Sequence, residues 1–143
     1  MNSKPLSRGL RNLNPGNIRH SKVRYRDEVT PSRDAEFREF RTIEAGYRAM
    51  FVLLHTYRLK HGCTTLREMI SRYAPPSENN TENYIRRVAY ATHLSPDEVI
   101  FATDGATMTA VVASMSKVEN GVSADMEQVW SGWRLFIADF PPK

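Results

Sequence analysis

One carboxylate in this sequence occupies a position where an ionised side chain is unfavourable. Glu119 follows Met115 by one helical turn, and so extends an apolar helix face formed by Met108, Val111, Val112, Met115 and Val118. Burial raises the pKa of a carboxyl group, and the negative end of a helix acts in the same direction. A carboxyl that stays protonated at neutral pH is the general acid needed to cleave a glycosidic bond. Alternatively, Glu119 borders the core and pairs with a basic side chain.

A short turn near the N-terminus carries two amide side chains suited to binding sugars. Residues 14–17 read Asn-Pro-Gly-Asn, a combination that predicts a tight turn. The amides of Asn14 and Asn17 are able to hydrogen-bond a sugar hydroxyl or an acetamido group. A well-formed turn without any ligand explains the same residues.

A second polar segment, residues 72–84, combines aromatic and amide side chains. Tyr73 and Tyr84 bracket a polar loop that contains Asn79 and Asn80. Tyrosine rings beside amides suit the faces and edges of sugar rings. A helix–loop–helix junction with a good helix cap is the alternative explanation.

Other chemistries leave no trace in the sequence. The histidines lack ligand spacing, and Cys63 is the sole cysteine, so we expect neither a metal site nor an intramolecular disulfide. The 14–17 turn is too short for a phosphate-binding loop and lacks its lysine. No serine lies in a nucleophile elbow. We therefore expect no cofactor.

Apolar spacing predicts a helical body from Thr42 onward. Its first helix ends at Gly62 and has a face with three- and four-residue steps: Tyr47, Met50, Phe51, Leu54 and Tyr57. A capping box at 65–68 opens a second helix. A third ends near Leu94, a fourth spans about residues 105–120, and a fifth begins at a Ser123 cap.

Residues 1–41 differ in composition from the rest of the chain. They are rich in Arg, Asn, Pro and Gly, and residues 22–26 alternate in a way that predicts a small β-hairpin or ribbon. We expect one mainly α domain over residues 1–143, with an irregular arm and ribbon (1–41) and a helical body (42–140).

The net charge of +4 suits an anionic partner such as nucleic acid, acidic lipid or bacterial cell wall. Nucleic acid is not expected, because acidic residues follow the basic arm closely and no helix-turn-helix or RNA-binding signature is present. The N-terminus lacks an apolar segment, so we expect synthesis in the cytoplasm without a signal peptide. No stretch is long enough to span a membrane.

The sequence resembles a family of phage and prophage proteins over about residues 8–121. The resemblance lies in four motifs, in this order: Arg-Gly-Leu-Arg-Asn-Leu-Asn-Pro-Gly-Asn-Ile-Arg from Arg8; Phe37-Arg38-Glu39-Phe40 with Thr42 to Ala49; Arg72-Tyr73-Ala74-Pro75-Pro76 with Glu78 to Thr81 and Tyr84-Ile85; and Glu119-Asn120-Gly121. Members are described as virion structural proteins or as lysozyme-like cell-wall hydrolases.

The order of these motifs resembles a circularly permuted lysozyme-like domain. In many muramidases and glucosaminidases a helix ends in the catalytic glutamate, and a β-ribbon and an Asn-rich turn follow it. Here the glutamate motif comes last, so the resemblance implies that Glu119 faces the 14–17 turn. Tyr25 and Tyr73 stand where many members have tryptophan, which affects the expected specificity more than the activity.

The resemblance implies a peptidoglycan-cleaving glycosidase, either a lysozyme or a lytic transglycosylase, with Glu119 as general acid. The sugar groove would be lined by Asn14, Asn17, Tyr25, Asn79, Asn80 and Tyr84. A second carboxylate would come from Asp27, Glu28, Asp34, Glu36 or Glu39. A transglycosylase needs none, because a hydroxyl of the substrate attacks.

The expected partner is bacterial peptidoglycan, and the expected state is a monomer. An enzyme of this kind reaches periplasmic peptidoglycan after holin release or as part of a virion. The alternative is a virion structural or wall-binding protein with the same fold and no turnover, in which Glu119 tolerates replacement by glutamine.

Overall fold

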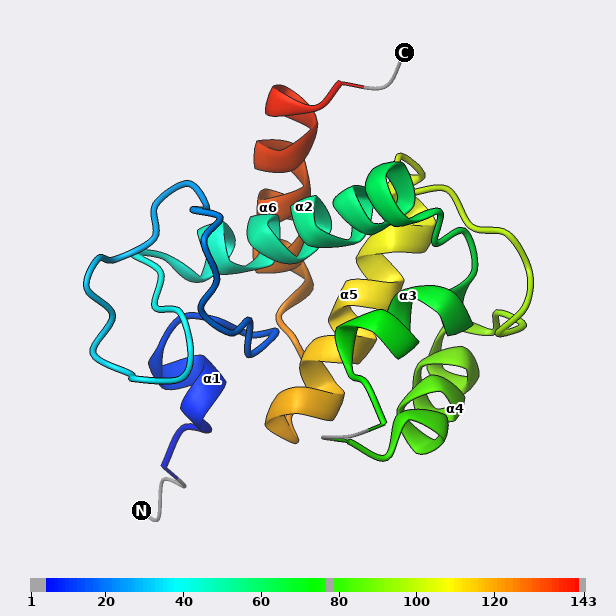
Figure 1. Cartoon of the computed structure of the whole chain (residues 1–143), viewed down its shortest axis with the longest axis horizontal. Coiled ribbons are helices and arrows are strands. Elements are labelled where there is room, and N and C mark those ends of the chain that lie inside the picture. Colours follow the sequence, from blue (N-terminus) through cyan, green and yellow to red (C-terminus); the bar gives the residue numbers. More distant parts are fainter. Residues whose placement is uncertain (1–4, 77–78, 142–143) are drawn as a thin grey trace.

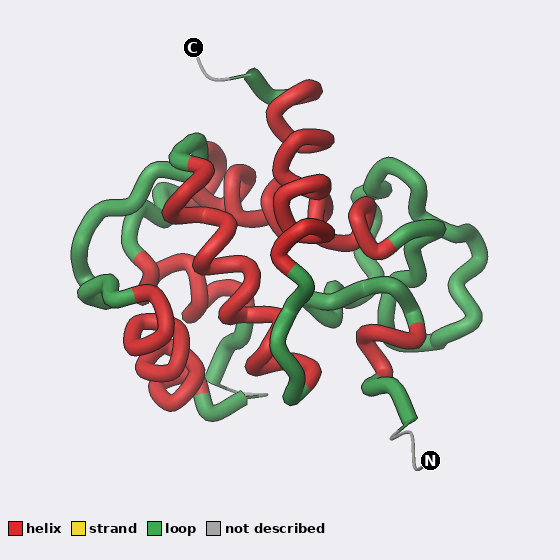
Figure 2. The backbone as a smooth tube through the Cα atoms, turned by 180° about the vertical axis from the view of Figure 1, so that it is seen from behind, coloured by secondary structure: helices red, strands yellow, loops and turns green. Residues whose placement is uncertain are grey.

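Helices form most of the chain from residue 43 onward, whereas loops form most of the residues before it (Figures 1 and 2). The computed structural model describes residues 5–76 and 79–141. The predicted mainly helical class is confirmed. The helices are α1 (Arg8–Arg11), α2 (Ile43–His61), α3 (Leu66–Tyr73), α4 (Thr81–Thr92), α5 (Gly105–Asn120) and α6 (Met126–Asp139).

Most helix boundaries follow the predicted caps. Gly62 ends α2 in the left-handed conformation, with φ of 64°, and Thr65 with Glu68 forms the capping box of α3. Ser123 was the wrong cap for the last helix. The carboxylate of Asp125 caps α6 instead by accepting from the Glu127 N–H at 2.9 Å, because α6 begins at Met126 and Asp125 is the residue directly before it.

The centre of the molecule is the crossing of α2 and α6 (Figure 1). Gly132 permits this close approach, because a Cβ there would lie 2.6 Å from the Tyr47 Cβ. Phe51 of α2 meets Trp133 of α6 edge to face, with ring centroids 5.1 Å apart. Helices α3, α4 and α5 pack in sequence beside this pair, and α5 also packs against α6.

The C-terminal end of α5 is attached to the N-terminal arm by Asn120. Its amide nitrogen donates to the Pro15 carbonyl at 2.8 Å, and its oxygen accepts from the Ser7 hydroxyl at 2.6 Å. Residues more than one hundred positions apart therefore meet at the end of α5. Glu119 is the residue before this junction.

The arm contains a short helix and loops in place of the predicted ribbon. Within the described part of the arm, antiparallel pairing is limited to isolated bridges, Arg19 with Phe37 and Glu28 with Phe40, and residues 22–26 form no strand. A few backbone hydrogen bonds link the arm segments, such as Arg38 N–H to the Ile18 carbonyl at 3.0 Å, and side chains add further bonds to the backbone. Asn14 bonds the backbone of Ile18 and the Arg38 carbonyl, and the Arg38 guanidinium donates to the Arg19 carbonyl at 2.9 Å.

Candidate active site

Glu119 lies where α5, α4 and the arm converge. Its Oε1 accepts from the Asn17 side-chain amide at 2.9 Å, and its Oε2 accepts from the Tyr84 hydroxyl at 2.9 Å. Asn17 belongs to the turn at 14–17, so Glu119 faces that turn as expected. Both of these donors are uncharged, and each fixes one oxygen of the carboxyl group.

Burial raises the pKa of Glu119 above its ordinary value of 4.5. The hydrogen bonds from Asn17 and Tyr84, and the charge of Arg19, act in the opposite direction but do not outweigh burial. Burial also raises the pKa of Tyr84 well above 10, so its hydroxyl keeps its proton and remains a donor at neutral pH. The carboxyl is therefore biased toward its protonated form and still has donors ready to stabilise the anion.

The Asn17 amide is held in place by an unusual backbone conformation. Its φ is 49°, in the left-handed region that asparagine tolerates better than most residues. The Asn17 N–H donates to the Asn14 carbonyl at 3.0 Å, which closes the predicted turn. On the other side of the turn, the Tyr73 hydroxyl donates to the Gly16 carbonyl. These bonds fix the turn between Glu119 and α3.

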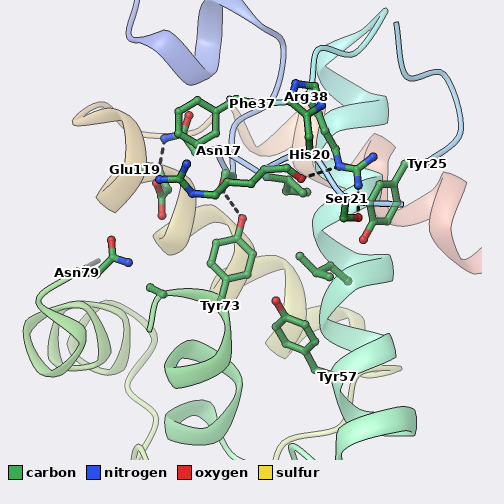
Figure 3. A pocket seen from close by; sticks show the side chains of 15 residues that line it. Asn17, His20, Ser21, Tyr25, Phe37, Arg38, Tyr57, Tyr73, Asn79 and Glu119 are labelled. Carbon is green, nitrogen blue, oxygen red and sulfur yellow. Dashed lines mark hydrogen bonds between the residues drawn. The ribbon is translucent and has the colours of Figure 1, made fainter. Parts of the chain in front are cut away.

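A cleft of about 330 Å³ opens beside Glu119, between the arm and the helices (Figure 3). Tyrosine side chains from three segments line it: Tyr25 of the arm, Tyr57 of α2 and Tyr73 of α3. In Figure 3, Glu119 and Asn17 lie at one end, and Tyr25, Ser21 and Arg38 lie at the other. This combination of an acid, rings and amides suits a polar ligand with flat apolar faces.

The predicted binding residues have different positions relative to the cleft. Asn17, Tyr25 and Asn79 line it. Tyr84 is 4% exposed and does not line the cleft, but its hydroxyl donates to Glu119. Asn80 caps α4 by accepting from the Asn83 N–H at 3.2 Å.

Asn14 has a structural position. It is fully buried, and its amide is bonded to the Ile18 N–H and to the carbonyls of Ile18 and Arg38, at 2.9–3.0 Å. These bonds leave the side chain inaccessible to a ligand. Its place is therefore beneath the cleft, where it holds the two arm segments together.

Several lining residues were not predicted. Arg38 is 2% exposed, forms an ion pair with Glu28 and lies 4.8 Å from the centroid of the Tyr25 ring. The Phe37-Arg38-Glu39-Phe40 motif marked this segment in the sequence. The motif alone does not show that the Arg38 side chain packs against the Tyr25 ring. Tyr57 was assigned only to the apolar face of its helix.

Among the described residues that line the cleft, Glu119 is the sole carboxylate. The candidate partners in the arm have other contacts. Asp34 is hydrogen-bonded to Arg8 and Asn12. The candidate glutamates form ion pairs with arginines: Glu28 with Arg38, Glu36 with Arg8 and Arg19, and Glu39 with Arg33. Asp27 also lies outside this lining.

Comparison with known proteins connects the chain to a bacteriophage. No protein-family profile matches the sequence. The sequence is 37% identical over 118 residues to Protein P5 of Pseudoalteromonas phage PM2, a match that covers 80% of this chain and 72% of that protein. The chain belongs to the Protein P5 family. The expected phage relationship is thereby supported, whereas the relative's name states no activity, substrate or partner.

Three general features of this P5-family chain complete the description of the site. Within residues 5–76 and 79–141, no cluster of three or more His, Cys, Asp or Glu side chains is arranged to hold a metal ion. In the same described part of the chain, no helix combines the length and apolarity needed to cross a bilayer. Cys63 is buried, and burial raises the pKa of its thiol, so it is a poor nucleophile.

Proposed function

We propose that this P5-family protein cleaves the glycan strand of bacterial peptidoglycan, with Glu119 as the general acid. The observation that carries the proposal is the Glu119 carboxyl itself, which lies in the wall of a tyrosine-lined cleft, with its pKa raised by burial. A carboxyl in this environment is suited to donate a proton to a glycosidic oxygen at neutral pH.

The surrounding residues suit the two stages of such a proton transfer. Glu119 donates its proton to the leaving oxygen as the glycosidic bond breaks. The resulting carboxylate then accepts hydrogen bonds from Asn17 and Tyr84. The rings of Tyr25, Tyr57 and Tyr73 offer faces for sugar rings along the cleft, and Asn79 offers an amide at its edge.

The absence of another carboxylate among the described lining residues favours the transglycosylase form of this chemistry. A hydrolase of the usual kind places two carboxyl groups on opposite sides of the scissile bond. In the transglycosylase form, a hydroxyl of the substrate attacks the anomeric carbon and returns its proton to Glu119. One residue then serves first as acid and then as base, and no water is consumed.

The position of Glu119 also supports a lysozyme-like plan in permuted order. A helix ends in Glu119-Asn120-Gly121, and the Asn-rich turn that faces it comes from the other end of the chain. Arg8, Arg19 and Arg26 of the arm are each paired with a carboxylate, which weighs against the arm as a surface for nucleic-acid phosphates. Action in the periplasm after release, or from a virion, remains part of this proposal.

A second candidate function is a virion structural or wall-binding protein without turnover. One observation favours it: both oxygens of Glu119 already have hydrogen-bond donors, as they would in a purely structural carboxyl. Such a protein would bind the wall and tolerate the loss of the acid.

Clearing of permeabilised Gram-negative cell walls separates the two candidates. The wild type should clear the suspension, and Glu119→Gln should lose activity by roughly 10²–10⁴-fold, which is the usual contribution of a general acid. Glu127→Gln, an exposed change on α6, is the matched control and should clear normally. Equal clearing by Glu119→Gln would place the acid elsewhere. Wall binding without clearing by any variant would support the structural candidate.

The glutamine variant should remain folded in this assay. Because burial raises the pKa of Glu119, the ionised carboxylate is less favourable in the folded chain than in the unfolded chain. A neutral amide avoids that cost but keeps one acceptor oxygen in place of two, so Glu119→Gln exchanges the cost of burial for one lost hydrogen bond and should melt close to the wild type at neutral pH. Circular dichroism melting checks this directly.

A further inference from the structure

A second hollow, the basic hollow, continues the cleft on the side away from Glu119. It shares Ser21, Tyr25, Leu53 and Tyr57 with the cleft, so the two spaces adjoin. Beyond these shared residues, its wall is formed by Val23 of the arm, by side chains of α2 and α3, and by Pro75 after α3. The lining residues used below are Lys60, His61 and Arg72.

The basic hollow contains two formally positive side chains and no carboxylate among its described lining residues. Lys60 and Arg72 are both exposed, and neither forms an ion pair within the described part of the chain. Glu68, one turn before Arg72 on α3, is held elsewhere: its Oε1 accepts from the N–H groups and hydroxyls of Thr64 and Thr65. The charge of the hollow is therefore not neutralised from within.

Arg72 is held in a defined position. Its guanidinium lies 5.5 Å from the centroid of the Tyr57 ring, and its Nη2 lies 3.1 Å from Nε2 of His61. The Tyr57 ring also meets the His61 ring, with centroids 6.4 Å apart. An arginine supported in this way loses less freedom when it binds an anion than a freely moving side chain does.

We propose that the basic hollow binds the carboxylates of the peptide stems on the glycan strand. This inference rests on the proposed function, because the strand must already lie in the cleft beside Glu119. Guanidinium and ammonium groups pair with carboxylates through charge-assisted hydrogen bonds. Lys60 and Arg72 thus select a strand that carries peptide stems over a bare glycan, at a site separate from the acid.

Binding measurements with the Glu119→Gln protein test this site without turnover. The probes are soluble glycan strands that carry peptide stems, and the same strands after an amidase has removed the stems. Calorimetry should show tighter binding of the stem-bearing strands. When Lys60→Gln and Arg72→Gln are introduced into this protein, its binding of stem-bearing strands should weaken by roughly tenfold or more, the scale of one charge-assisted bond. Its binding of bare strands should stay unchanged.

A matched control removes two positive charges elsewhere. Arg86→Gln with Arg134→Gln gives the same net charge, and neither residue lines the cleft or the basic hollow. This control should bind both kinds of strand like its parent. An equal loss in the control would show general charge attraction and overturn the inference.

The remaining outcomes separate this inference from the proposed function. Equal binding of stem-bearing and bare strands by the parent would overturn the inference and leave the proposed function intact. An equal loss on both strands after the Lys60 and Arg72 changes would show that these residues bind the sugar chain, which also overturns it. Failure to bind either kind of strand would overturn both proposals.

Discussion

At the level of single residues, opposing influences act on the pKa of Glu119. Burial raises its pKa, whereas the hydrogen bonds from Asn17 and Tyr84 lower it. A general acid needs this balance, because a carboxyl that is too acidic loses its proton before the reaction, and one that is too weak does not release it. Activity should therefore fall as pH rises through the raised pKa of Glu119.

Replacement of Tyr84 by phenylalanine tests this balance. The change removes a hydrogen bond that favours the carboxylate, so the pKa of Glu119 should rise further. The alkaline limb of the pH–rate profile should move to higher pH, and the maximum rate should fall. Tyr90→Phe is the control, because Tyr90 is 85% exposed on the same helix. If the pH–rate profile of Tyr84→Phe is the same as that of the wild type, then Tyr84 does not influence the pKa of the catalytic acid.

The sequence allowed Glu119 to be singled out but did not determine the role of each amide. Its place on an apolar helix face identified Glu119, and the order of motifs predicted that it faces the 14–17 turn. Asn14 and Asn17 looked equivalent, since the same donors and acceptors serve a backbone or a sugar. Only the path of the arm shows that Asn14 is buried while Asn17 reaches the acid.

At the scale of the element, side chains determine the shape of the arm. Helix boundaries were predictable because caps and apolar spacing are local signals. The arm was not predictable, because its backbone groups are bonded partly to backbone groups of distant arm residues and partly to the side chains of Asn14 and Arg38. The alternation at 22–26 resembled a strand, but an alternating pattern does not form a strand without a partner ladder.

Asn14→Ala measures the contribution of Asn14 to the arm. The change leaves the Ile18 N–H and the Arg38 carbonyl without their partner in a buried region, while the Ile18 carbonyl still accepts from the Arg38 N–H. We expect a loss of about 2–3 kcal/mol in the free energy of unfolding, the scale of unsatisfied buried groups, measured by urea denaturation. Asn79→Ala, at an exposed site in the cleft, should cost less than about 0.5 kcal/mol. Unchanged stability for Asn14→Ala combined with loss of wall binding would instead place Asn14 in the sugar site.

At the scale of the whole molecule, the cleft exists because the arm is fastened to the helical body at several points. Asn120 holds the arm at the end of α5, and Tyr73 holds it at α3. Asp139 at the end of α6 accepts from Arg48 of α2 at 2.9 Å and from Arg26 of the arm at 3.1 Å. The Arg26–Asp139–Arg48 contact joins the arm and the C-terminal end of α6 to α2.

Asp139→Asn tests this contact. The arginines hold the pKa of Asp139 below its ordinary value of 3.8, so the carboxylate stabilises the folded chain above that pH, and the effect is lost as pH falls through the lowered pKa. The variant should be less stable than the wild type at pH 7, and the difference should narrow below pH 3.8. Hydrogen exchange should also show faster opening of the arm. A stability difference that does not vary with pH would exclude an ionic role for Asp139.

Mass spectrometry of the reaction products shows whether Glu119 breaks a glycosidic bond. Purified peptidoglycan treated with the wild type should release fragments with new glycan ends, and the Glu119→Gln protein should release none while still binding the wall. Fragments lighter by one water than hydrolysis products would identify attack by the substrate's own hydroxyl, which is the form of the reaction proposed above. If the wild type produces no new glycan ends, or if Glu119→Gln releases the same fragments, then Glu119 is not the general acid of a glycosidase.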